Sequence, residues 1–105
     1  MAQFDVYHNT NAATRGRTPY ILDLQSDVMS VLPTRLVCPI RLRSALGTAP
    51  IERIHLLVTV ENEECVVFLS ELTAVPAGII GGRLSSLQRF RQDIVAGIDL
   101  LITGF

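Results

Sequence analysis

The hydrophobic pattern of this chain changes its period once, near residue 85, and this change limits the folds that are open to it. Before residue 85, short runs alternate apolar and polar residues, which is the period of half-buried β-strands. After it, apolar residues recur at helical spacing. Strands followed by one terminal helix predict an α+β or mainly β architecture, a small barrel of antiparallel strands with one C-terminal helix. Because the βαβ alternation is missing, a parallel α/β sheet is not expected.

Chain length and charge narrow the class of protein further. The 105 residues, 49% of them hydrophobic, predict one domain spanning residues 1–105, since two cores of ordinary size would not fit. Nine arginines against ten acidic residues give a net charge of −1, so binding to nucleic acid by bulk phosphate attraction is not expected. Any role on DNA would run through a protein partner. Without a secretion signal or a long apolar segment, we expect a cytoplasmic protein that makes no membrane contact.

Individual strands are predicted by the alternating runs at residues 3–7, 20–25, 36–40, 54–60, 65–69 and 72–75. The polar stretch 8–19 predicts a surface loop, and residues 41–50 predict one short helical or irregular turn. Pro39 lies inside the third run and cannot donate a ladder hydrogen bond, so we expect that strand to be bulged, at a sheet edge, or cut short. Gly81 and Gly82 are expected to close the β part.

Two features are the strongest local signals. The runs 54–60 and 65–69, joined by the charged segment 61–64 with its asparagine, predict a β-hairpin with a solvated tip. The helix should be about 16 residues long, because Ser85 and Gln88 have the capping-box spacing and Gly104 stands where a helix stops. Its predicted apolar stripe consists of Leu87, Phe90, Ile94, Val95, Ile98, Leu101 and Ile102.

Residues that could carry chemistry are few. Cys38 and Cys65 follow no metal-ligand spacing and lie in apolar runs, which predicts buried reduced thiols, with a disulfide left open. His8 borders a polar loop. His55 could act as a general base, but no recognisable turn presents a nucleophile, so a structural role is favoured. We therefore expect no catalytic residue, metal or cofactor.

The end of the predicted helix breaks a local rule. A helix C-terminus favours basic side chains, yet the only charged side chain from Ile94 onward is Asp99, at a cost of about 0.3–1 kcal/mol. Leu100 lies opposite the apolar stripe on a helical wheel, and Phe105 follows the helix stop. Either Leu100 packs on a loop and Phe105 frays, or the two residues form a protein-binding tip that a two-fold axis could enlarge.

Several segments together resemble the CcdB toxins of bacterial toxin–antitoxin modules, in register over essentially the whole chain. The most specific pair is the Leu-Gln-Ser-Asp block followed by the Arg-x-Val-x-Pro spacing. The matching segments are Gln3-Phe4-x-Val6-Tyr7, Asp23-Leu24-Gln25-Ser26-Asp27-Val28, Arg35-Leu36-Val37-x-Pro39-Ile40, Ala74-Val75-Pro76 and the terminal Gly104-Phe105.

This resemblance implies a fold, a mechanism and partners. The fold would be the SH3-like barrel with a C-terminal helix that is shared with MazF and Kid toxins, assembled as a homodimer. Such proteins are not enzymes: they poison DNA gyrase, a type II topoisomerase, by binding its A subunit and trapping the complex in which DNA is cleaved. A CcdA-like antitoxin wraps the toxin with a disordered segment, and the two together repress their own operon, so DNA is reached only through antitoxin or gyrase.

The resemblance also assigns residues. By position, the gyrase-binding residues would be Thr103, Gly104, Phe105, Asp99, Val28 and Met29. Potent gyrase poisons of the family carry a tryptophan where this chain has Thr103, and the chain contains no tryptophan. Because aromatic anchors often dominate interface energy, two alternatives stay open. One is a non-toxic or retargeted homologue that still binds antitoxin, and the other is a MazF-like endoribonuclease using Arg15, Arg17, Arg35 or His55.

Overall fold

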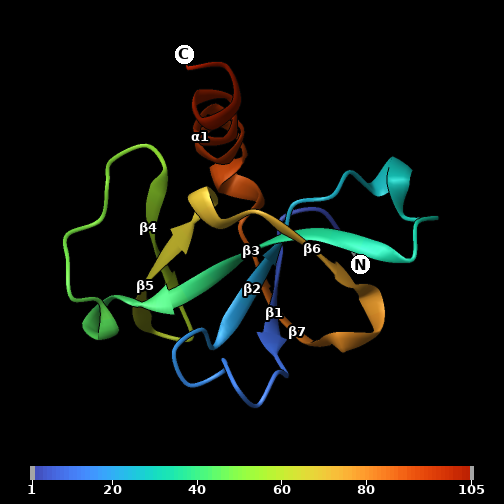
Figure 1. Cartoon of the computed structure of the whole chain (residues 1–105), viewed down its shortest axis with the longest axis horizontal. Helices are drawn as coiled ribbons and strands as arrows, with labels where there is room; N and C mark the ends of the chain where they lie inside the picture. The colour runs from blue at the N-terminus through green and yellow to red at the C-terminus, as the bar shows by residue number, and fades with distance from the viewer. Residues whose placement is uncertain (1, 105) are drawn as a thin grey trace.

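A curled antiparallel sheet with one C-terminal helix makes up the computed structural model, which describes residues 2–104 (Figure 1). The hydrogen-bonded strand order is β4-β5-β3-β2-β1-β7, and β6 pairs with β3. This arrangement confirms the predicted small barrel with a C-terminal helix. The strands are β1 (Asp5–Asn9), β2 (Tyr20–Asp23), β3 (Thr34–Leu42), β4 (His55–Val60), β5 (Glu63–Phe68), β6 (Thr73–Pro76) and β7 (Ile80–Ser86). The helical elements are the 3₁₀ turns η1 (Asp27–Met29), η2 (Arg43–Ala45), η3 (Leu69–Glu71), η4 (Ala77–Ile79) and η5 (Gln88–Phe90), and the α-helix α1 (Arg91–Thr103).

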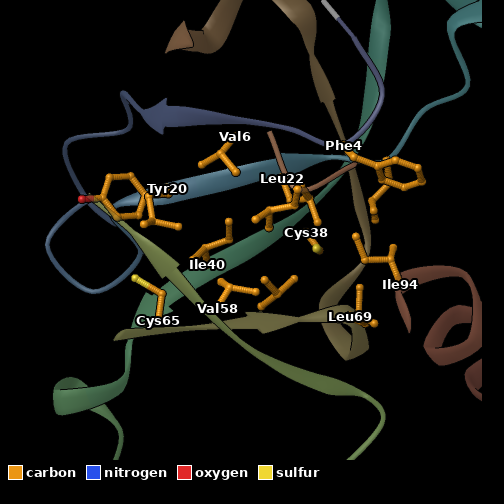
Figure 2. Close-up of a cluster of buried hydrophobic side chains, with 14 residues drawn as sticks. Phe4, Val6, Tyr20, Leu22, Cys38, Ile40, Val58, Cys65, Leu69 and Ile94 are labelled. Carbon is orange, nitrogen blue, oxygen red and sulfur yellow. The ribbon is translucent and has the colours of Figure 1, made fainter. Parts of the chain in front are cut away.

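The apolar core lies between one face of β1–β2–β3 and the β4–β5 hairpin, and α1 closes one end through Ile94 (Figure 2). Both cysteines contribute to this core as free thiols, which confirms one of the two open readings and excludes the disulfide. Burial raises the pKa of Cys38 and the pKa of Cys65. The two thiols are therefore protonated packing groups rather than nucleophiles. The core side chains labelled in Figure 2 are Phe4, Val6, Tyr20, Leu22, Cys38, Ile40, Val58, Cys65, Leu69 and Ile94.

Pro39 does not interrupt its strand, so the expectation of a bulged, edge or shortened strand is wrong. β3 is nine residues long and pairs with β2 along one side. Along its other side it changes partner, from β6 over residues 34–37 to β5 over residues 40–42. The amide of Leu24 donates to the carbonyl of Leu36, so by alternation the nitrogen of Pro39 points away from β2. The missing N–H therefore falls in the gap between two partner strands, where no ladder bond is lost.

The β4–β5 hairpin is confirmed, with a shorter tip than the sequence predicts. Val60 pairs directly with Glu63, which leaves Glu61 and Asn62 as a two-residue turn. Their φ angles of 52° and 63° are the left-handed values that a type I′ hairpin turn requires. Glu63 and Glu64 consequently belong to β5 rather than to the tip.

Gly81 and Gly82 lie inside β7, so the expectation that they end the β part is wrong. β7 pairs with β1 across two register shifts. A Cβ at Gly81 would come within 3.0 Å of Thr10 Cγ2 and of the carbonyl oxygen and Cβ of His8. Glycine here permits a close approach between irregularly paired strands instead of marking a turn.

The helix begins later than predicted. Ser85 and Ser86 complete β7, and α1 starts at Arg91 after η5, which gives 13 residues instead of about 16. The predicted capping box is therefore wrong: Ser86 Oγ accepts a 3.1 Å hydrogen bond from the amide of Gln88 in a local turn. The periodicity predicted too early a start for the helix. The buried Leu87 continues the helical spacing, although its backbone is still turning from strand to helix.

Candidate protein-interaction site

Helix α1 packs on the barrel through Ile94, Gly97 and the half-buried Ile98. Ile94 and Gly97 are buried, and Gly97 meets the barrel so closely that a Cβ there would lie 2.5 Å from both the Arg53 carbonyl oxygen and Leu69 Cδ1. Beyond this contact the helix projects away from the sheet, with the C-terminus at its far end (Figure 1). The apolar stripe therefore continues past the core that it was predicted to cover.

The projecting end exposes apolar side chains, but not the one that the helical wheel singled out. Leu100, expected to face outward, is half-buried. Ile102 and Leu101, expected to pack, are 73% and 40% exposed. A helical wheel assumes that a core lies beneath the whole stripe, and here the core ends one turn earlier. We use the name α1 tip for residues 99–104.

The backbone of the α1 tip is closed by local hydrogen bonds. Gly104 has a φ of +80°, and its amide donates to the Leu100 carbonyl at 3.0 Å, which confirms the predicted glycine stop. Thr103 Oγ1 donates to the Asp99 carbonyl at 2.7 Å. Asp99 is exposed, and the last turn contains no basic residue. Phe105 lies outside the described residues.

A second exposed apolar surface lies on the segment between β2 and β3. Val28 and Met29, both in η1, are 85% and 44% exposed. The structure adds Val31 and Leu32, which are also exposed and which the sequence reasoning missed. Their signal was visible: four large apolar residues stand within a segment that serine, aspartate and proline mark as a turn. We use the name η1 loop for residues 26–33.

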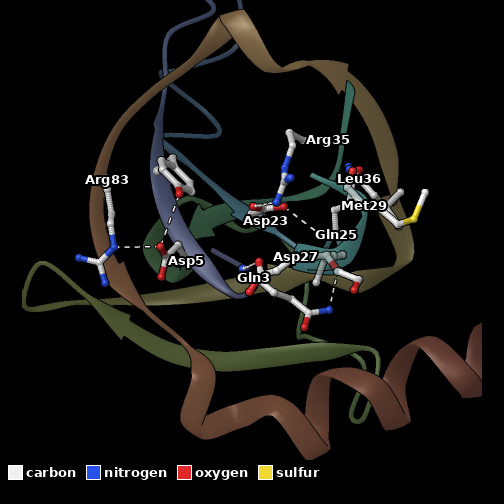
Figure 3. A network of polar contacts seen from close by, with 12 residues as sticks. Gln3, Asp5, Asp23, Gln25, Asp27, Met29, Arg35, Leu36 and Arg83 are labelled. Carbon is white, nitrogen blue, oxygen red and sulfur yellow. Dashed lines mark hydrogen bonds and ion pairs between the residues drawn. The ribbon is translucent and has the colours of Figure 1, made fainter. Parts of the chain in front are cut away.

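Buried polar side chains hold the η1 loop from beneath (Figure 3). Gln25 Nε2 donates to the Met29 carbonyl at 2.8 Å, and Gln25 Oε1 accepts from the amide of Leu36 at 2.9 Å. The amide of Gln3 donates to Asp27 Oδ1 at 2.8 Å. Gln25 thus links the loop to β3, and Gln3 links the loop to the segment just before β1.

The base of this network is a buried ion pair. Arg35 Nη2 donates to Asp23 Oδ2 at 2.5 Å, and both side chains are almost fully buried. Asp23 Oδ1 also accepts from the amide of Gln25 at 3.1 Å. The polar residues of the two most specific sequence segments therefore build the scaffold of the loop, whereas the exposed surface comes from apolar residues between them.

Within one chain the two surfaces are separate. Figure 1 shows the η1 loop and the α1 tip projecting from the barrel at different places, with a gap between them. The structure thus keeps Asp99, Thr103 and Gly104 together on one surface and Val28 and Met29 together on another. It does not join all of the sequence-predicted residues into a single site.

Comparison with protein families decides the classification. The family model described as CcdB protein matches residues 3–104. The chain belongs to the CcdB family. Membership confirms the resemblance seen in the sequence and supports a role as the toxin of a toxin–antitoxin system.

A solved structure shares the fold. An endoribonuclease from a Mycobacterial species, determined in complex with its cognate antitoxin, superimposes with a TM-score of 0.70 and 11% sequence identity. The match covers 97% of this chain and 94% of that chain. At this identity the likeness concerns the fold. It places this CcdB-family chain on a scaffold that in the neighbour binds an antitoxin.

His55 makes two contacts that favour its structural interpretation. Its Nδ1 accepts a 2.9 Å hydrogen bond from the amide of Ile51, so the proton of the neutral ring lies on Nε2. Nε2 lies 3.1 Å from Ser70 Oγ and therefore donates to it. A ring that donates to this hydroxyl cannot remove its proton. His55 instead links the loop before β4 to η3.

Among residues 2–104, no group of three or more histidine, cysteine or acidic side chains is placed to hold a metal ion. No helix in this part of the chain has the length and apolar character needed to span a membrane.

Proposed function

We propose that this protein is a type II toxin that binds the A subunit of DNA gyrase and traps the complex in which DNA is cleaved. Membership of the CcdB family supports the proposal, and the exposed α1 tip is the observation that carries it. The mechanism is selective binding. A ligand with higher affinity for the cleaved state than for the resealed state shifts the population toward broken DNA.

The α1 tip has the composition of a small docking surface. Leu101 and Ile102 offer apolar area beside the exposed carboxylate of Asp99, while Thr103 and Gly104 keep the last turn closed. One helix end is small for a stable interface, so we propose a homodimer in which two tips act together. Phe105 would extend this surface.

The η1 loop provides a second proposed contact. A buried polar network holds the backbone of the segment that carries Val28 and Met29, so this backbone is ordered before binding. Ordering in advance lowers the entropic cost of association. In a dimer, the two loops would flank the two tips or bind another part of the same partner.

The same protein would bind a CcdA-like antitoxin in the cytoplasm. A free antitoxin segment would release gyrase, and toxin and antitoxin together would repress their operon. DNA contact would run through the antitoxin or through gyrase, in agreement with the net charge of −1.

A DNA-cleavage assay tests the proposal. Purified protein is incubated with gyrase and supercoiled DNA, and the mixture is denatured before electrophoresis. We expect linear DNA to accumulate, and we expect deletion of Gly104 and Phe105 to abolish it. Leu57→Ser, which changes an exposed leucine on β4, is the matched control and should retain activity. DNA that stays unchanged with the intact protein would reject gyrase as the target.

Thr103 distinguishes a gyrase poison from a non-toxic or retargeted homologue. Expression without an antitoxin should arrest growth of a gyrase-sensitive bacterium if the proposal holds. Normal growth with folded protein supports the homologue instead. Thr103→Trp then restores the aromatic anchor, and recovered DNA cleavage would locate the loss at this position.

An endoribonuclease is the second candidate, because the structural neighbour has that activity on the same fold. The contacts of the residues first considered for it give weak support. Arg35 is committed to Asp23, and His55 to Ile51 and Ser70, which leaves Arg15 and Arg17 exposed on the loop after β1. Incubation with single-stranded RNA separates the two functions, since a gyrase poison leaves RNA intact.

A further inference from the structure

Strand β4 forms one edge of the sheet, since within residues 2–104 it pairs with β5 alone. Natural edge strands carry charged residues, proline or bulges that hinder pairing with another chain. At the opposite edge, β7 contains Arg83 and two register shifts against β1, and β6 is four residues long and ends at Pro76. The residues of β4 include no proline, arginine or acidic side chain, and their pairing with β5 is continuous. By composition, β4 is open to an added strand.

Alternate residues of β4 direct their backbone groups away from β5. Val60 and Glu63 flank a two-residue turn, so this pair exchanges ladder hydrogen bonds, and every second residue before Val60 also faces β5. The carbonyl of Ile54 fits this alternation, because it accepts from the amide of Leu69, just after β5, at 3.1 Å. The N–H and C=O groups of the intervening residues 55, 57 and 59 therefore point outward.

Most of these outward groups have no protein partner. The amide of His55 donates to the carbonyl of Ile51 at 2.9 Å. In the part of the chain that the structure describes, Leu57 and Thr59 make no backbone hydrogen bond outside the β4–β5 ladder, and both are exposed. The edge thus offers the amides of Leu57 and Thr59 as donors and the carbonyls of residues 55, 57 and 59 as acceptors.

A cleft of about 540 Å³ lies along this free edge. Leu56 and Leu57 both line it, and because neighbouring side chains of a strand point to opposite faces, a cleft that touches both lies at the outer edge of β4. The other wall is the segment between η2 and β4, which contributes Ala49 and Pro50 and which Figure 1 shows as a wide arc. The arc hinders the approach of a whole sheet but leaves space for one strand.

The charged residues of the cleft have no partners within the chain. Arg43, Glu52 and Arg53 line it, and none of the three takes part in an ion pair within residues 2–104. Two arginines and one glutamate give the lining a net positive charge, in a chain whose net charge is −1. An occupant with a carboxylate would complement this charge.

We infer that the cleft binds one extended peptide segment of a partner protein, which adds a strand beside β4. The backbone groups of Leu57 and Thr59 supply the pairing, the apolar lining selects aliphatic side chains, and the two arginines select a carboxylate. A second copy of the chain fits less well, because the arc lies in the path of its sheet. The inference is independent of the proposed function, since no residue of the α1 tip or the η1 loop lines the cleft.

Selection from random peptides displayed on phage, with the full-length protein as bait, tests the chemistry. We expect enrichment of sequences that alternate leucine, isoleucine or valine with other residues and contain aspartate or glutamate. A synthetic peptide from the selection is then N-methylated at one residue at a time. Methylation should weaken binding about tenfold or more at every second residue, whose amide faces β4, and should have little effect at the residues between.

Hydrogen exchange locates the bound peptide on the protein. The outward amides of Leu57 and Thr59 should exchange more slowly when the peptide is present, because they gain hydrogen bonds. The amide of Val58 faces β5 and is the internal control, since its exchange should not depend on the peptide. Protection confined to other strands would show that the peptide binds elsewhere and would overturn the inference.

Two substitutions test the cleft from its two walls. Leu57→Pro removes an outward donor without removing a ladder bond and should abolish binding, whereas Leu57→Ala keeps the amide and should lose less. Ala49→Trp fills the cleft from the arc and should weaken binding about tenfold or more. Ala12→Trp, at an exposed alanine outside the cleft, is its matched control and should bind unchanged. Circular dichroism checks that each variant folds, and Ala49→Trp decides the test if Leu57→Pro does not.

A charge reversal tests the selection of a carboxylate. Arg43→Glu combined with Arg53→Glu should replace acidic by basic residues in the selected peptides. Arg15→Glu combined with Arg89→Glu changes two exposed arginines outside the cleft, and this control should leave the acidic preference in place. Peptides of the same composition from both double variants would overturn the assigned role of the arginines.

The remaining outcomes each contradict the inference. No enrichment, an N-methylation profile without alternation, or unchanged binding by Ala49→Trp would overturn it. Self-association of the native protein that Leu57→Pro abolishes would also overturn it and would assign the β4 edge to a second copy of the chain.

Discussion

The η1 loop and the α1 tip present similar apolar surfaces but are held in opposite ways. The η1 loop has little regular structure, and its shape depends on Gln25 and the Asp23–Arg35 pair beneath it. The α1 tip is regular helix held by its own backbone and by a cap at Gly104, and its last buried anchor is Gly97. One surface is ordered by tertiary contacts and the other by local ones.

This difference determines how each surface responds to change. Loss of a buried partner should disturb the η1 loop together with the whole barrel, because the scaffold of the loop is part of the barrel. Loss of a capping residue should loosen the α1 tip while the barrel stays folded.

Arg35→Ala should have the largest effect. It leaves the buried Asp23 carboxylate without its cation, which should lower the free energy of unfolding by about 3–5 kcal/mol. Urea denaturation followed by circular dichroism measures the change. Arg43→Ala, an exposed arginine, is the control and should stay within about 0.5 kcal/mol. A loss below about 1 kcal/mol for Arg35→Ala would mean that the ion pair does not support the barrel.

Gly97→Ala should be the next largest and acts on the anchor of α1. The added Cβ would overlap the Arg53 carbonyl and Leu69, and such overpacking costs about 1–3 kcal/mol despite the better helix propensity of alanine. Gly78→Ala is the matched control, because no heavy atom lies within 4 Å of its added Cβ. Thermal denaturation should separate the two variants, and equal stability would show that α1 can shift without cost.

Sequence reasoning succeeded where one local rule dominates. The hairpin between β4 and β5 and the glycine stop of α1 follow from turn chemistry and were predicted. It failed where tertiary structure decides, because Pro39 is tolerated only through the change of partner strands beside it, and Gly81 serves a close approach between strands. A single sequence does not show which strands lie beside Pro39 or which atoms approach Gly81.

The candidate surfaces likewise have features that local sequence rules predict and features that only the tertiary structure decides. Exposure of Ile102 and burial of Leu100 depend on where the core beneath α1 ends, which periodicity does not report. The resemblance pointed to Val28 and Met29 but not to the network that holds them. Gln25 and Arg35 belong to the segments that carry the resemblance, but their contacts with the Met29 carbonyl and with Asp23 appear only in the fold.

Gln25→Ala sharpens the comparison by releasing the η1 loop without removing a charge. It deletes the hydrogen bonds to the Met29 carbonyl and to the Leu36 amide, at a net cost of about 1 kcal/mol. Hydrogen exchange should accelerate at Leu36 and across residues 26–32 and remain unchanged in α1. Gln88→Ala, an exposed glutamine, is the control. Faster exchange in α1 as well would show that the two surfaces are coupled.

Gly104→Ala should have the smallest effect on stability, because it acts on the locally ordered surface. Alanine disfavours the left-handed conformation at φ +80°, but the last turn can fray instead, so the barrel should lose less than about 1 kcal/mol. The amide of Gly104 and those of the preceding turn should exchange faster, while Gly104→Asn, which tolerates this conformation, should preserve their protection. If Gly104→Ala lowers the melting temperature as much as Gly97→Ala does, the α1 tip is supported by contacts beyond its own turn. Such a result would contradict the distinction between the α1 tip, ordered by its own turn, and the η1 loop, ordered by contacts with the barrel.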